Sequence, residues 1–111
     1  MEIKYAQSKG KLYIYLSGEL DEYSAKYAKS EIEEAIASCG NLKCVVFNFA
    51  NTTFMDSTGI GVLLGRYKVL KKIGIPIYIQ NPGVSINKIL QISGIYEIMP
   101  KIYNGAKKYE K

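Results

Sequence analysis

Apolar and polar side chains alternate over the first part of the chain, which is the pattern of strands that bury one face. The alternation runs over residues 3–5 and again over residues 12–16. Between them, Ser8-Lys9-Gly10-Lys11 contains the glycine that is typical of a short hairpin loop. The pattern therefore predicts an antiparallel β-hairpin at the start of the chain.

A change to helical spacing follows between residues 24 and 38. The apolar positions that share one face there are Ala25, Ala28, Ile32, Ala35 and Ile36. Ser24 is placed to act as the N-cap and Gly40 to stop the helix. We expect an amphipathic helix with its apolar face on the sheet.

The remaining chain alternates between short apolar runs and helical patterns. The run at 44–49 is nearly all apolar, as in a strand buried on both faces of a parallel sheet. We then expect a loop at 50–55, a helix at 57–73, a strand at 75–79, a short helix at 84–92, an edge strand at 96–99 and a last helix at 101–111. This order predicts an α/β fold. It forms a single domain over residues 1–111, with a mixed sheet of four or five strands, beginning with the hairpin, and about four helices.

The predicted helix at 57–73 is unusual because it contains Gly59, Gly61 and Gly65. Each glycine costs a helix interior up to about 1 kcal/mol relative to alanine. With about 3.6 residues per turn, Ser57, Gly61, Gly65 and Lys68 fall on one side, next to the core-facing side. A strip of small residues behind a serine fits either close packing inside the domain or close approach by a partner, and periodicity leaves both open.

The start of this helix, Asp56-Ser57-Thr58, permits three interpretations. Asp56 or Ser57 can cap the helix, a role worth about 1 kcal/mol. Free N–H groups at a helix start also favour anions, so a nucleotide-binding domain is an alternative, although no Walker A loop is present. A phosphate attached to Ser57 would add about −2 of charge at a positive helix end without unfolding it.

The amino-acid composition excludes several kinds of catalytic, metal and nucleic-acid site. Histidine is absent, which excludes Ser-His-Asp and Cys-His catalysis and the common zinc sites. Cys44 is expected to be a buried small hydrophobe, and its spacing from Cys39 does not suggest a metal site. The net charge of +5 comes without the interleaved aromatic residues of a nucleic-acid module, so we expect no direct nucleic-acid binding.

The distribution of apolar segments predicts the cellular location and the oligomeric state. No run of about 18 apolar residues is present, and the N-terminus lacks an apolar signal segment. We therefore expect a cytoplasmic protein with no membrane contact. We also expect a monomer, because no long apolar edge strand or heptad pattern is evident.

Three segments resemble one known family. The stretch from Phe54 to Lys68 resembles the phosphorylation segment of bacterial anti-sigma factor antagonists, which are STAS-domain proteins. Gly18-Glu19-Leu20-Asp21 is similar to their upstream loop, and residues 90–95 are similar to their late Leu-x-x-Ser-Gly-Leu segment. The resemblance covers essentially the whole chain, and residues 65–68 make it most similar to the sporulation sigma-F branch.

The resemblance implies a switched binding protein and not an enzyme. In this family, the unphosphorylated protein binds an anti-sigma factor that is also an ATP-dependent serine kinase, which releases the sigma factor. The kinase phosphorylates the serine that matches Ser57, and a metal-dependent serine phosphatase resets it. No catalytic residue, cofactor or metal of its own is implied.

The resemblance also assigns site residues. Ser57 would be the phosphorylation site, and the alternative role of Asp56 is that of a plain helix cap. The implied partner-binding residues are Glu19, Asp21, Asp56, Thr58, Gly59, Gly61, Gly65, Arg66 and Lys68. Arg66 is either a rim contact or merely solvated, and Glu19 is either a contact or a solvated charge. A STAS module of another signalling complex, such as a stress-response pathway, remains an alternative.

Overall fold

The predicted hairpin forms one edge of the sheet. In the computed structural model, which describes residues 1–103, strand β1 (Glu2–Ser8) pairs antiparallel with β2 (Lys11–Leu20). Lys9 and Gly10 connect them with φ values of 53° and 82°. Positive φ at both central residues is what a two-residue hairpin turn requires, and glycine adopts it without steric cost.

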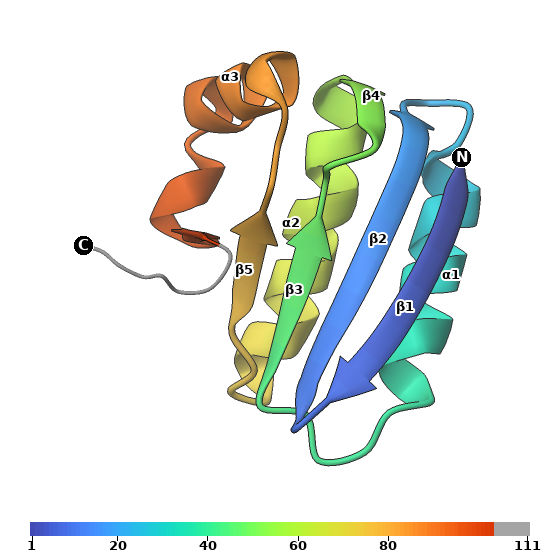
Figure 1. Ribbon diagram of the computed structural model, residues 1–111, viewed down its shortest axis with the longest axis vertical. Coiled ribbons are helices and arrows are strands. Elements are labelled where there is room, and N and C mark those ends of the chain that lie inside the picture. The colour runs from blue at the N-terminus through green and yellow to red at the C-terminus, as the bar shows by residue number, and fades with distance from the viewer. Residues whose placement is uncertain (104–111) are drawn as a thin grey trace.

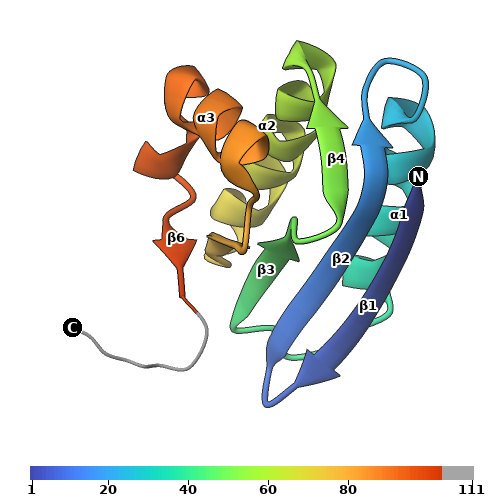
Figure 2. The same cartoon turned by 45° about the horizontal axis from the view of Figure 1, so that its top comes forward.

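The other strands run parallel to β2. They are β3 (Cys44–Asn48), β4 (Thr52–Met55), β5 (Ile77–Gln80) and β6 (Lys101–Ile102). The order is β1-β2-β3-β5-β6. Because β2 is long, its first half pairs with β3 and its second half with β4, which continues beyond the end of β3 (Figure 2).

Helices cover one face of this sheet. The helices are α1 (Ala25–Ala37), α2 (Ser57–Lys72) and α3 (Val84–Ser93), followed by a 3-10 turn at Ile95–Glu97. Figure 1 shows α1 and α2 behind the strands and α3 beyond their upper ends. The core lies between the sheet and these helices, and its largest fully buried side chains include Phe47, Phe49, Leu63 and Leu70. In the described chain, no helix covers the front of the strands.

Several predicted elements are confirmed. The run at 44–49 is buried throughout, as a central parallel strand should be. The long helix begins at Ser57 as expected, and Gly94 ends α3 with a φ of 79°. Ser24 does stand at the N-cap of α1, but its hydroxyl makes no capping bond and donates instead to the Glu19 carbonyl at 2.7 Å.

Other predictions are wrong. Residues 52–55, expected in a loop, form β4, and the edge strand expected at 96–99 is replaced by the 3-10 turn. The last helix, expected at 101–111, begins instead with β6, and residues 104–111 lie outside the described residues. Residues 1–103 therefore contain six strands and three α-helices rather than four or five strands and about four helices.

Candidate functional site

Ser57 is exposed at the start of α2, at the edge of the sheet where the parallel strands end. Asp56 precedes it as the N-cap, and its Oδ1 accepts hydrogen bonds from the N–H groups of Thr58 at 2.9 Å and Gly59 at 3.2 Å. The capping interpretation is therefore confirmed for Asp56. It also means that a carboxylate already occupies the anion-attracting end of the helix, which disfavours a bound nucleotide phosphate there.

The three glycines of α2 have two different roles. A Cβ on Gly59 would lie 2.7 Å from the Leu20 carbonyl oxygen and 2.9 Å from Met55 Cγ, so this glycine allows close internal packing. A Cβ on Gly61 or Gly65 would meet nothing within 4 Å. The expectation that Gly59 contacts a partner directly does not fit its burial, whereas Gly61 and Gly65 leave bare backbone facing open space.

A shallow groove of about 370 Å³ follows these two glycines. Its lining comprises Lys29 from α1 and Thr58, Gly61, Val62, Gly65 and Arg66 from α2. Thr58 and Gly61 are exposed, and Lys68 lies exposed on the next turn of α2. The structure therefore places Ser57, Thr58, Gly61, Gly65 and Lys68 on one accessible strip, which we call the α2 strip.

Arg66 is not the merely solvated residue that was one of its two predicted roles, and its role as a rim contact for a partner stays a prediction. Its side chain is only 11% exposed, and Nη1 lies 2.6 Å from Oε2 of Glu33 on α1. The ion pair holds the guanidinium between the two helices at the edge of the groove. Arg66 therefore joins α1 to α2, and the idea that it is merely solvated is wrong.

The loop after β2 lies next to the start of α2. Glu19 pairs with Phe54 in the β2–β4 ladder, and the Asp56 N–H approaches the Leu20 carbonyl at 3.4 Å. Asp21 Oδ1 accepts from the N–H groups of Tyr23 at 3.0 Å and Ser24 at 3.1 Å. The two segments that resemble family motifs thus meet in space, with Asp21 shaping its own turn and Glu19 exposed.

Some surface residues at this site were missed by sequence reasoning. Lys29 lines the groove because α1 packs beside α2, and no pattern within either helix reveals that contact. Phe54 is 49% exposed and Tyr23 is 88% exposed on the segments that meet there. An alternating or helical pattern favours burying such side chains, so their exposure could not be predicted.

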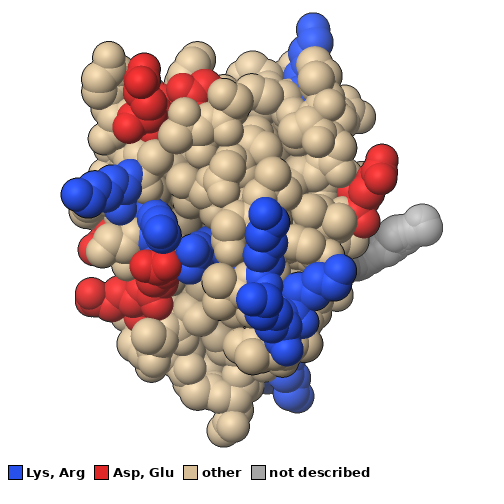
Figure 3. Space-filling view, turned by 180° about the vertical axis from the view of Figure 1, so that it is seen from behind, with Lys and Arg blue, Asp and Glu red and all other residues tan. Residues whose placement is uncertain are grey.

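Figure 3 views the molecule from the helix side. Uncharged surface occupies its upper middle, with acidic side chains at the upper left and basic ones across the middle and lower right. Within residues 1–103, no group of three or more histidine, cysteine, aspartate or glutamate side chains could hold a metal ion. None of the helices described there is long and apolar enough to cross a membrane.

Comparison of the sequence identifies relatives over nearly all of the chain. The STAS domain profile matches residues 2–108. The chain is 33% identical over 100 residues to the anti-sigma F factor antagonist of Paenibacillus polymyxa, covering 90% of this chain and 85% of that protein. It is 24% identical over 99 residues to the anti-sigma-B factor antagonist of Bacillus subtilis, covering 89% and 88%.

Solved structures lead to the same group. The anti-sigma factor antagonist SpoIIAA in its unphosphorylated form superposes with a TM-score of 0.75 at 28% identity, covering 93% of this chain and 90% of that one. SpoIIAA of Bacillus in the phosphorylated form superposes with a TM-score of 0.68 at 28% identity, covering 93% of each chain.

Proposed function

The chain belongs to the STAS domain family, and on that premise we propose that it is an anti-sigma factor antagonist whose binding is switched by phosphorylation of Ser57. The observation that carries the proposal is the α2 strip. An exposed serine begins a helix whose next two turns carry the exposed Gly61 and the half-buried Gly65, both with open space where a side chain would be.

The unphosphorylated protein would bind the anti-sigma factor through this strip. Because glycine has no side chain, a partner can pack directly on the helix backbone at Gly61 and Gly65. Glu19 is exposed at the end of β2, beside β4 and the start of α2, and basic partner side chains can pair with its carboxylate. Binding by this surface would free the sigma factor that the anti-sigma factor otherwise holds.

Phosphorylation would block the same surface while leaving the fold intact. A phosphate on Ser57 adds about −2 of charge and considerable bulk at an exposed position. Asp56 already bonds two N–H groups of the first turn, so the phosphate would stay outside and beside a carboxylate. The bulk of the phosphate would then obstruct the close approach of the partner to the bare helix backbone at Gly61 and Gly65. No core residue is displaced, since Ser57 is exposed.

The reaction chemistry would reside in the partners. The proposed anti-sigma factor is itself a serine kinase that uses ATP, and a metal-dependent serine phosphatase reverses the modification. This chain would be a monomeric substrate and ligand, without catalysis or a cofactor of its own. We place it in the cytoplasm, where sigma factors and ATP are available to such a system.

A role with a sigma-F-type partner is preferred to one in another signalling complex. The identity of 33% to an anti-sigma F factor antagonist exceeds the 24% to an anti-sigma-B factor antagonist over nearly the same length. Pull-down of the anti-sigma factor together with its sigma factor would separate the two assignments.

The proposal is tested by incubating the protein with the candidate anti-sigma kinase and ATP and locating any phosphate by fragment mass spectrometry. We expect one phosphate on Ser57. Ser57→Ala should abolish the modification, whereas Thr58→Ala should retain it. A phosphate on Thr58, or none from a kinase shown to be active on another substrate, would contradict the proposed switch.

A further inference from the structure

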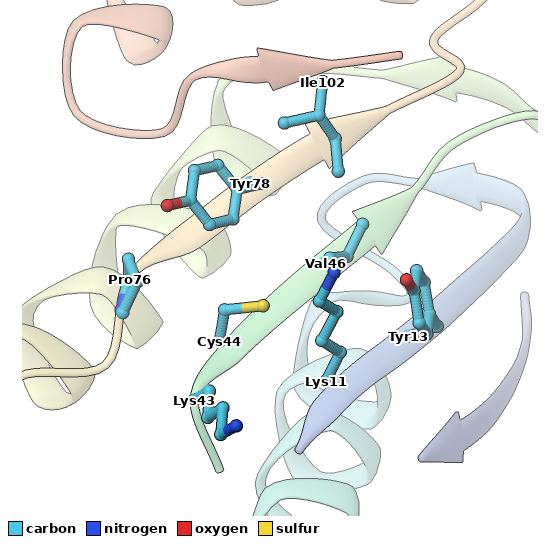
Figure 4. Close-up of a pocket in the computed structure, with 8 residues that line it drawn as sticks. All are labelled: Lys11, Tyr13, Lys43, Cys44, Val46, Pro76, Tyr78 and Ile102. Carbon is cyan, nitrogen blue, oxygen red and sulfur yellow. The ribbon is translucent and has the colours of Figure 1, made fainter. Parts of the chain in front are cut away.

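The face of the sheet opposite α1 and α2 contains a hollow of about 470 Å³. Its floor is formed by Cys44 and Val46, which point away from the helices on β3 (Figure 4). This volume lies within the range of about 300–1,000 Å³ that is usual for small-molecule sites. The hollow is unrelated to the α2 strip, which lies on the helix side.

The pairing of the strands gives the hollow its shape. Tyr13 on β2 and Tyr78 on β5 are both in register with Val46 on the strand between them. Because neighbouring strands are about 4.8 Å apart, the two tyrosine Cα atoms are separated by roughly 10 Å across Val46. Two aromatic side chains thus border an apolar floor, and Ile102 on β6 adds an apolar side further along (Figure 4). We call this hollow the tyrosine groove.

The charges on the tyrosine groove have one sign and lie toward one end. Lys11 and Lys43 line it where β2 and β3 begin, and Figure 4 shows the Lys11 side chain extending toward Val46. No carboxylate lines the groove, and neither lysine has an ion-pair partner within residues 1–103. Lys11 is close enough to Cys44 to lower the pKa of that thiol, although burial has the larger effect and raises it. The groove therefore combines an apolar body with a cationic end.

We propose that the tyrosine groove binds a small amphipathic carboxylate, with its anionic group at Lys11 and Lys43 and its apolar body between Tyr13 and Tyr78. Aromatic and aliphatic walls favour hydrocarbon, and the two ammonium groups select an anion over a neutral or cationic molecule of the same length. The cationic end of the groove lies at the opposite edge of the sheet from Ser57, so ligand binding and partner binding are separable.

Charge argues against two other occupants. The C-terminal residues 104–111 contain three lysines and one glutamate, so they would bring further positive charge to a cationic groove. A second copy of the chain, with a net charge of +5, would meet a similar repulsion. A small anion would instead be attracted by the two lysines.

Octanoate, octanol and octylamine make a matched set of probes, because they share one chain length and differ in charge. Each would be titrated into the ¹⁵N-labelled protein (residues 1–111) while amide chemical shifts are recorded. We expect saturable shifts at Tyr13, Val46 and Tyr78 with octanoate, at least tenfold weaker binding of octanol, and no saturation with octylamine. Octanoate affinity should fall as salt is raised.

Charge-neutralising variants provide the control. Lys11→Gln with Lys43→Gln should weaken octanoate binding about tenfold and leave octanol binding unchanged. Lys72→Gln with Lys88→Gln removes the same charge from exposed helix positions and should leave octanoate binding unchanged. The assignment fails if octanoate shifts no groove residue, if both double variants weaken it equally, or if octanol binds as well. It also fails if groove signals instead depend on protein concentration or show contacts with residues 104–111, which would identify a second copy or the chain's own end as the occupant.

Discussion

At the residue scale, the site depends on differences between side chains of the same type. Gly59 and Gly61 are two positions apart on α2, yet one is pressed against Leu20 and the other faces open space. Asp56 and Asp21 both order their local backbone, but only Asp56 caps a helix. Residues of the same type therefore have different roles here, because their surrounding contacts differ.

The two glycines make a matched pair for a stability measurement. Gly59→Ala should lower the free energy of unfolding by about 1–3 kcal/mol, because its methyl group would overlap the Leu20 carbonyl. Gly61→Ala should leave stability unchanged or raise it by up to about 1 kcal/mol, as alanine favours the helix and meets no neighbour. Urea denaturation measures both, and equal destabilisation would contradict the separate roles.

The two cysteines should differ in reactivity. Burial raises the pKa of the Cys44 thiol above its ordinary value of 9.0, and the nearby Lys11 charge only partly opposes this. Since the thiolate is the reactive form, Cys44 should resist alkylation near pH 8 more than the half-buried Cys39 does. Iodoacetamide labelling of the native protein, followed by peptide mass spectrometry, should find Cys39 modified first. Preferential labelling of Cys44 would contradict the burial of its thiol.

At the element scale, the sequence predicts the helices and strands whose apolar residues recur at a regular spacing. The hairpin, the central buried strand and the start of α2 follow from alternation, an apolar run and a capping signal. Strands β4 and β6 could not be predicted, because they contain four and two residues and depend on pairing with β2 and β5. Helical periodicity predicts that Ser57, Gly61, Gly65 and Lys68 share one side of α2. The place of Thr58 beside them and the Arg66–Glu33 pair depend on how α1 packs against α2, which the sequence pattern does not show.

Asn87 on α3 holds the end of the described chain in place. Its Oδ1 accepts hydrogen bonds from the Tyr96 hydroxyl at 2.6 Å and from Lys101 Nζ at 2.9 Å. Asn87→Ala should lower stability by about 1–2 kcal/mol, since it removes both bonds from part-buried groups. Amide exchange at Lys101 and Ile102 should accelerate more than exchange in β3. Unchanged exchange at β6 would show that strand pairing alone fixes this segment.

At the scale of the whole molecule, the sheet separates two surfaces. The α2 strip lies on the helix side where the parallel strands end, and the tyrosine groove lies on the other side with its lysines where they begin. A charge placed on Ser57 therefore changes one surface without disturbing the core or the other surface. Under the proposed function, this separation would let a phosphate on Ser57 act on partner binding alone.

The most direct test of this account is the calorimetric affinity of the protein for its cognate anti-sigma factor, measured for the unmodified chain and for Ser57→Asp. We expect Ser57→Asp to bind the anti-sigma factor at least tenfold more weakly, equivalent to about 1.4 kcal/mol, because the added charge lies on the α2 strip that contacts the partner. Thermal stability should be nearly unchanged, since Ser57 is exposed and its helix start tolerates an acidic residue.

Ser8→Asp supplies the control, because it adds the same charge at an exposed position at the opposite end of the molecule. It should bind as the unmodified chain does. Equal affinity of the unmodified chain and Ser57→Asp, or equal weakening by Ser8→Asp, would contradict the proposed switch at Ser57.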